Sequence, residues 1–101
     1  MINEKLNKIN EKSIEIVNFH LHTEDNVLEL LLNVLCDNEK YIINFHNVSC
    51  LSVNCVSFPI IIQGFEIIYN KNRGWDSIHR YRIDDYEDGL LSFFCEKIEI
   101  L

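Results

Sequence analysis

The stretch "YRIDDYEDGLLSFFCE" (residues 81–96) places the polar tip "DYEDG" between two segments that alternate like β-strands. Asp88 followed by Gly89 is a strong hairpin signal, because glycine accepts the positive φ that tight turns require. Asp84, Asp85, Glu87 and Asp88 crowd acidic side chains around this tip. The stretch therefore predicts a β-hairpin, and it raises the question of what an acidic tip does there.

The same pattern repeats along the chain. "TEDN" (residues 23–26) and "DNEK" (residues 37–40) consist of short polar residues that favour turns, and apolar residues alternate around both. Gly64 indicates a bulge or a close backbone approach. We expect strands at 13–22, 27–36, 41–48, 49–59 (with a bulge), 63–69, 77–84 and 90–100. The fold class that follows is mainly β, an antiparallel β-sandwich or small barrel of about seven strands.

Strict alternation also assigns side chains to faces. In residues 27–36 the even-numbered positions from Leu28 to Cys36 form one face, opposite Glu29 and Asn33. In residues 13–22 alternation groups Val17 with the apolar Phe19 and Leu21, and puts the remaining residues on the other face: Ile14, Ile16, Asn18, His20 and His22.

Length and composition predict a single domain over residues 1–101. Ile2, Leu6 and Ile9 follow helical spacing, so residues 1–12 are expected to form a short amphipathic helix or an ordered arm before a β core at 13–101. The longest apolar run, "FPIII" at 58–62, is far shorter than a membrane span, and no signal segment is recognisable. We expect a cytoplasmic protein with no membrane contact and with reduced cysteines.

The net charge of −7, from 16 acidic residues against nine lysines and arginines, disfavours direct binding to nucleic acid. The charge is uneven, because residues 71–82 carry four basic residues and one acid, whereas residues 84–101 carry six acids and one lysine. An acidic surface of this kind suits a basic protein partner.

The acidic tip has a simple interpretation as a solvated turn, since turns favour Asp. It is too short for a calcium loop, and acids on one turn cannot face each other across a glycosidase cleft. The alternative is a partner-binding surface, because aromatic residues and arginines lie next to the acids. Its candidate residues are Trp75, Arg80, Arg82, Asp84, Asp85, Tyr86, Glu87 and Asp88. Trp75 could equally cap the core.

The spacing of the histidines and cysteines matches no defined metal-binding motif. His20 and His22 project from one face of a strand, and His46 and Cys50 could join them, but no CxxC pair accompanies them. We therefore expect no metal and no cofactor, and we expect Cys36 and Cys95 to be core residues. Cysteine–histidine pairs can be drawn with His46 or His79, but no glycine-rich elbow supports a nucleophile. The sequence does not predict an enzyme.

Three segments carry a resemblance: "FHNVSCLSV" (45–53), "GFEI" (64–67) and "YRIDDYEDGLLSFFCEKIEI" (81–100). In this order they resemble small bacterial proteins of immunity (toxin-neutralising) or uncharacterised type, over the C-terminal half of the chain. The resemblance implies a cytosolic antidote that binds a toxin without catalysis, and it transfers no functional residue.

The functional prediction is a non-enzymatic acidic protein-binding module, most plausibly an immunity or inhibitor protein that neutralises a basic toxin or effector. One alternative is a phage-encoded inhibitor of a host defence protein, because the Asn, Ile and Lys content of the chain suits an AT-rich bacterial or phage source. Another is a small ligand-binding or zinc-binding β domain. An exposed edge strand would also permit a homodimer.

Overall fold

Two-residue turns organise the first half of the fold in a computed structural model that describes residues 4–54, 57, 59–69 and 79–101. Asp25 and Asn26 both have positive φ, and so do Asp37 and Asn38. Two consecutive positive φ values define the turn whose twist matches that of the flanking strands. The predicted hairpins at "TEDN" and "DNEK" are therefore confirmed.

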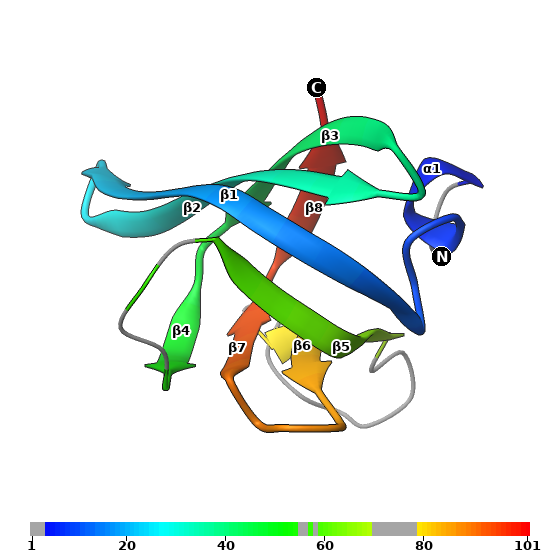
Figure 1. Cartoon of the computed structure of the whole chain (residues 1–101). Helices are drawn as coiled ribbons and strands as arrows, with labels where there is room; N and C mark the ends of the chain where they lie inside the picture. The colour runs from blue at the N-terminus through cyan, green and yellow to red at the C-terminus, as the bar shows by residue number, and fades with distance from the viewer. Residues whose placement is uncertain (1–3, 55–56, 58, 70–78) are drawn as a thin grey trace.

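Within these described ranges, eight antiparallel strands form one sheet, in the order β4-β7-β6-β5-β1-β2-β3-β8 (Figure 1). The mainly β prediction is confirmed, and the extra strand arises because the expected strand at 90–100 is broken at Glu96. The elements are α1 (Glu4–Asn7), β1 (Lys12–Glu24), β2 (Val27–Cys36), β3 (Glu39–His46), β4 (Ser49–Val53), β5 (Ile60–Tyr69), β6 (Tyr81–Asp85), β7 (Leu91–Cys95) and β8 (Lys97–Ile100).

The sheet curls around its core without closing. β4 and β8 are its end strands, yet β4 follows directly after β3 and β8 follows directly after β7. The two bends lie against each other, since the backbone N–H of Glu96 donates to the carbonyl of His46 at 2.9 Å. Each end strand is thus tied by the chain to the opposite side of the sheet (Figure 1).

The concave side of the sheet buries the core. Phe45 and Phe93 meet edge to face with ring centroids 5.0 Å apart, a favoured aromatic geometry. In β2 the predicted face is correct, because Leu30, Leu32, Val34 and Cys36 are all buried. The other fully buried large side chains are Ile9, Ile14, Ile16, Ile43, Ile62, Phe65, Ile83 and Leu91.

The face assignment in the first strand is wrong, and a β-bulge explains why. The register between β1 and β2 shifts between Ile16 and Asn18, so one extra residue is accommodated there. Ile14 and Ile16 point into the core, whereas Val17 is 44% exposed. A bulge reverses the alternation beyond it, which is why Ile14 and Ile16 do not share a face with His20 and His22.

The N-terminal helix α1 is short and closes one end of the core. Leu6 and Ile9 are buried at 3% and 0% exposure, as their helical spacing predicts. The side chain of Asn10 accepts a hydrogen bond from the backbone N–H of Ile67 at 2.8 Å, which anchors this segment to β5. Among the described residues no helix has both the length and the apolar character needed to cross a membrane.

Candidate functional site

The acidic tip between β6 and β7 is organised by a buried carboxylate. Asp85 is only 2% exposed, and its side chain accepts hydrogen bonds from the backbone N–H groups of Glu87 at 3.2 Å, Asp88 at 3.3 Å and Leu90 at 3.0 Å. Gly89 has a φ of 62°, as the hairpin signal predicted. The tip is therefore a loop of one defined shape, because a charged acceptor satisfies three of its donors.

The burial of Asp85 corrects its assignment as a partner-contacting residue. β6 alternates, so Ile83 and Asp85 point inward while Arg82 and Asp84 point outward. The Asp85 carboxylate is used entirely within the turn and cannot reach a partner. Asp85 positions the loop, and the exposed acids of the tip are Glu87 and Asp88.

Tyr86 lies over β5 at the position of Gly64. Its backbone N–H donates to the Gly64 carbonyl at 3.0 Å. A Cβ at Gly64 would lie 2.9 Å from the Tyr86 ring and 2.8 Å from Cγ of Glu87, so only glycine leaves room for this contact. Tyr86 nevertheless remains 51% exposed. The structure confirms both predictions for Gly64: the backbone of Tyr86 approaches it closely, and the register between β1 and β5 shifts there, because Ile62 to Phe65 on β5 pairs with Ile14 to Lys12 on β1 and accommodates one extra residue.

Two acids face each other on the outer surface beside the tip. Glu66 of β5 and Asp84 of β6 are direct cross-strand partners, an arrangement that is destabilising for like charges. Among the described residues, Arg82 brings a cation to this pair, with its Nη2 3.6 Å from Oδ2 of Asp84. We call the side chains of Glu66, Asp84, Tyr86, Glu87 and Asp88 the acidic surface. It joins residues from two strands and one turn.

The remaining predicted contact residues fall in different places. Arg80 and Arg82 are exposed next to the acidic surface. Trp75 lies outside the described residues. Tyr81 of β6 is partly buried and packs against the core, and its ring is 5.1 Å from that of Tyr69. Burial raises the pKa of the Tyr81 phenol, and the neighbouring Tyr69 adds to the shift.

A second polar cluster lies where β2, β3 and β8 meet, and the sequence interpretation missed it. Nδ1 of His46 is 2.6 Å from Oε1 of Glu29, and its Nε2 is 3.0 Å from Oε1 of Glu99. Glu29 is 7% exposed, and its other oxygen accepts the backbone N–H of Asn47 at 3.1 Å. The amide Nδ2 of Asn44 lies 3.3 Å from the same Nε2 of His46, so this ring contacts polar side chains from three strands.

The four possible metal ligands, His20, His22, His46 and Cys50, do not form one cluster in the structure. His20 and His22 lie side by side on β1, with ring centroids 5.5 Å apart, whereas His46 is engaged by Glu29 and Glu99. Cys50 is exposed on β4 with a φ of 54°, next to the register shift that confirms the predicted bulge. Across the described ranges, no group of three or more His, Cys, Asp or Glu residues is arranged to hold a metal ion.

Two cysteines are core residues, as predicted. Cys36 and Cys95 are buried at 3% and 0% exposure. Burial raises the pKa of the Cys95 thiol to about 12, and burial followed by the nearby Asp37 raises the pKa of Cys36. Both thiols stay protonated near neutral pH, and a protonated thiol is a poor nucleophile.

Comparison with known proteins finds no family model, no curated protein and no solved structure that matches this chain. The site must therefore be interpreted from its own geometry.

Proposed function

We propose that this protein is a non-enzymatic protein-binding module whose acidic surface docks on a basic protein. Within that class, the proposal is an immunity or inhibitor protein that occupies the cationic surface of a toxin or effector. The observation that carries it is the pairing of Glu66 with Asp84 on the outer face, directly beside the exposed Glu87 and Asp88.

Like charges at directly opposed positions cost folding free energy. The cost is only weakly offset within the described part of the chain, because the ion pair found there is the 3.6 Å approach of Arg82 to Asp84, and the Arg82 side chain is 46% exposed. A partner that brings lysines or arginines to these carboxylates would relieve the repulsion. The same charges would also speed its diffusional approach.

Preorganisation supports the proposal as well. A flexible acidic loop would lose conformational entropy on binding. Here Asp85 fixes the backbone of the tip through three hydrogen bonds, and Gly64 seats the ring of Tyr86. An exposed, immobilised tyrosine beside carboxylates is the composition typical of an interface anchor.

The test uses proteins encoded by the reading frames that flank the gene, each purified and titrated by calorimetry. We expect one basic product to bind, and we expect the affinity to fall steeply as salt shortens the Debye length to about 8 Å and below. The triple variant Asp84→Asn, Glu87→Gln, Asp88→Asn should weaken binding by at least about tenfold, with an unchanged far-ultraviolet circular dichroism spectrum.

The matched control is Glu4→Gln, Glu24→Gln, Asp25→Asn, which removes the same number of charges from exposed positions distant in sequence from the tip. It should bind nearly as well as the natural protein. Equal losses in the two variants would show that net charge alone attracts the partner. Binding that survives both the tip variant and high salt would refute the acidic surface as the interface.

A further inference from the structure

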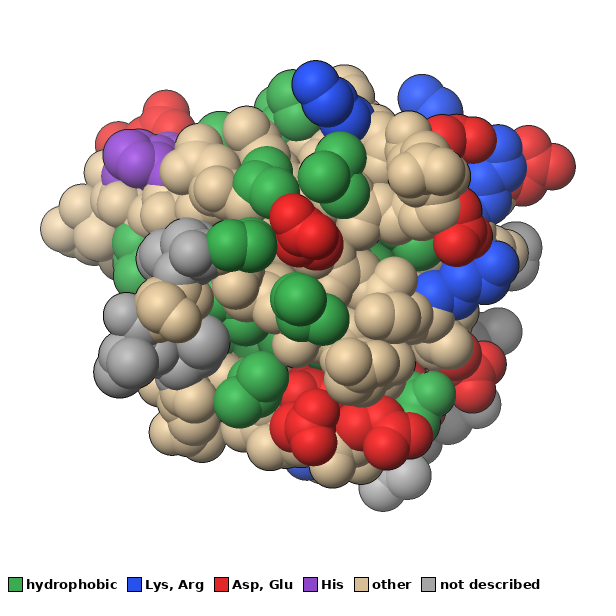
Figure 2. All heavy atoms as spheres, in the orientation of Figure 1, with side chains coloured by type: hydrophobic (Ala, Val, Ile, Leu, Met, Phe, Trp, Pro, Cys, Tyr) green, Lys and Arg blue, Asp and Glu red, His purple; other side chains and the backbone are tan. Residues whose placement is uncertain are grey.

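A second surface lies on the convex side of β5, β1, β2 and β3, and it is apolar. Val17, Ile42 and Ile61 are 44%, 41% and 48% exposed. Leu35 joins them, because one hollow is lined by Val17, Leu35 and Ile42 and the next by Leu35 and Ile61. Figure 2 shows hydrophobic side chains gathered on this side of the molecule, with an acidic side chain among them. We call these four side chains the apolar face.

A single carboxylate, Glu15, stands in the middle of the apolar face. Its cross-strand neighbours are Leu35 on β2 and Ile61 on β5, so it is flanked by aliphatic side chains on both sides. The side chain of Glu15 makes no hydrogen bond or ion pair with any residue in the described part of the chain. A charge in such surroundings lowers the stability of the fold, since aliphatic neighbours reduce its contact with water.

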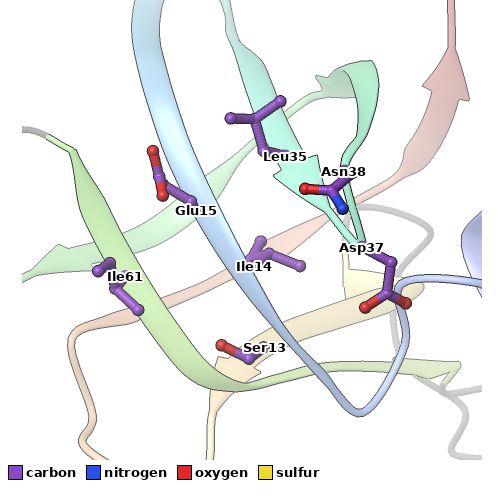
Figure 3. Close-up of a pocket in the computed structure, with 7 residues that line it drawn as sticks. All are labelled: Ser13, Ile14, Glu15, Leu35, Asp37, Asn38 and Ile61. Carbon is purple, nitrogen blue, oxygen red and sulfur yellow. The ribbon is translucent and has the colours of Figure 1, made fainter.

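The hollow around Glu15 is open to solvent, and its lining combines carboxylates with aliphatic side chains, a composition that suits a cationic side chain with an apolar stem (Figure 3). It has a volume of about 400 Å³ and is lined by Ser13, Ile14, Glu15, Leu35, Asp37, Asn38 and Ile61. Asp37 at its rim already has a cation, because Nζ of Lys12 is 3.5 Å away. Glu15 is therefore the carboxylate that an incoming cation would meet.

We propose that the apolar face is a second docking site of the proposed protein-binding module, and that it receives an arginine flanked by aliphatic residues of the protein partner. Arginine fits better than lysine, because its guanidinium is weakly hydrated and can pair with a carboxylate through two hydrogen bonds. Its methylene stem would lie along Ile61 and Leu35. The inference rests on the proposed function and specifies the chemistry of the partner.

Charge argues for a basic partner and against a second copy of this chain on the same face. A two-fold contact would bring two Glu15 carboxylates and two chains of net charge −7 together. The apolar face is also continuous with the acidic surface, because β5 carries both Ile61 and Glu66. One partner spanning β5 could engage both surfaces.

The experiment is a ¹H–¹⁵N nuclear magnetic resonance titration of the full chain with the peptide acetyl-Leu-Arg-Leu-amide. The control peptide replaces arginine by citrulline, which has nearly the same shape and no charge. We expect the arginine peptide alone to shift the amide signals of Glu15, Leu35 and Ile61. Glu15→Gln should weaken its binding by at least about fivefold, the equivalent of about 1 kcal/mol, whereas the exposed-charge control Glu24→Gln should leave it unchanged.

Each of the following results would overturn the inference. Shifts confined to residues 84–88, or equal shifts with the citrulline peptide, would show that the apolar face does not select a cation. A lack of localised shifts would show that it does not bind the probe. Concentration-dependent self-association abolished by Glu15→Gln would assign the face to a second copy. If the calorimetric partner binds and is weakened by the tip variant but not by Glu15→Gln, the proposed function stands and this inference fails.

Discussion

Two carboxylates are buried among the residues that the structure describes, and their hydrogen-bond partners come from different distances along the chain. The Asp85 carboxylate accepts hydrogen bonds from three backbone N–H groups within five residues of it along the chain. Glu29 is served by His46 and by the backbone of Asn47, which lies 18 residues away in sequence. One carboxylate shapes its own loop, and the other joins separate strands. The partners of Asp85 are fixed by the turn that follows it, whereas those of Glu29 are fixed by the register between strands.

The difference has a functional side. The Asp85 loop presents exposed charges to the outside, and the buried residue itself stays within the turn. The Glu29 cluster instead ties β2, β3 and β8 together at the place where the chain bends into β4. We therefore interpret the first region as the support of an interface and the second as a stabilising cross-strand contact.

The largest effect is expected from Asp85→Ala. The substitution leaves three backbone donors without their charged acceptor, so the free energy of unfolding should fall by about 3 kcal/mol. Urea denaturation would measure the loss. Asp88→Ala is the control, because this side chain is exposed and should cost less than about 0.5 kcal/mol. Similar losses for the two variants would contradict the structural role of Asp85.

A double-mutant cycle on Glu29→Gln and His46→Gln would test the distant pair. Each variant should lose about 2 kcal/mol, because its buried or half-buried partner is left unsatisfied. The pair should show a coupling energy of about 1 to 2 kcal/mol in urea unfolding. Glu99→Gln is the comparison, since its side chain is 47% exposed and exposed pairs contribute little. Additive losses from Glu29 and His46 would mean that their 2.6 Å contact does not stabilise the fold.

Gly64→Ala would break the one close contact that seats the acidic tip on β5. We expect a loss of about 1 to 2 kcal/mol, because the new Cβ would overlap the Tyr86 ring. Adding Tyr86→Ala should restore most of it. Gly89→Ala should also lose about 1 kcal/mol, but through its positive φ rather than through crowding. Tyr86→Ala should therefore not rescue Gly89→Ala, and rescue of both would refute the steric explanation.

The smallest effect concerns the opposed acids of the acidic surface. Glu66→Gln should raise the free energy of unfolding by up to about 0.5 kcal/mol at low salt, because it removes a like-charge cross-strand pair. High salt should erase the gain. Thermal unfolding at two ionic strengths would show this, with Glu24→Gln as the neutral reference. A loss of stability at low salt would show that Glu66 has a stabilising role in the free protein.

Much of the fold follows from local chemistry. The turns at Asp25–Asn26, Asp37–Asn38 and Gly89 were predictable because short polar residues and glycine tolerate positive φ. Most strands followed from alternation. The bulge at Val17 was not predictable in this way, because an inserted residue leaves no distinct composition behind. It is specified by the packing of Ile14 and Ile16 into the core.

The candidate sites also differ in whether local sequence or contacts between strands determine them. The exposed acids of the tip could be named from the sequence, but the burial of Asp85 could not, since neighbouring acids look alike until strand faces are assigned. The Glu29–His46 pair was within reach of register counting, because the Asp37–Asn38 turn pairs Cys36 with Glu39 and leads outward to Leu30 and Phe45. Glu29 and His46 are the next step along that register. The aliphatic surroundings of Glu15 could be recognised only after both strands that pair with β1 were known.

By itself, the amino-acid sequence determined the strands, the tight turns, the acidic balance and the helical N-terminus, because each depends on residues close together in the chain. Tertiary structure alone decided which carboxylates are buried, where the sheet bends and which apolar side chains remain outside. Those outcomes depend on contacts between strands distant in sequence, and only the curled sheet brings these strands together.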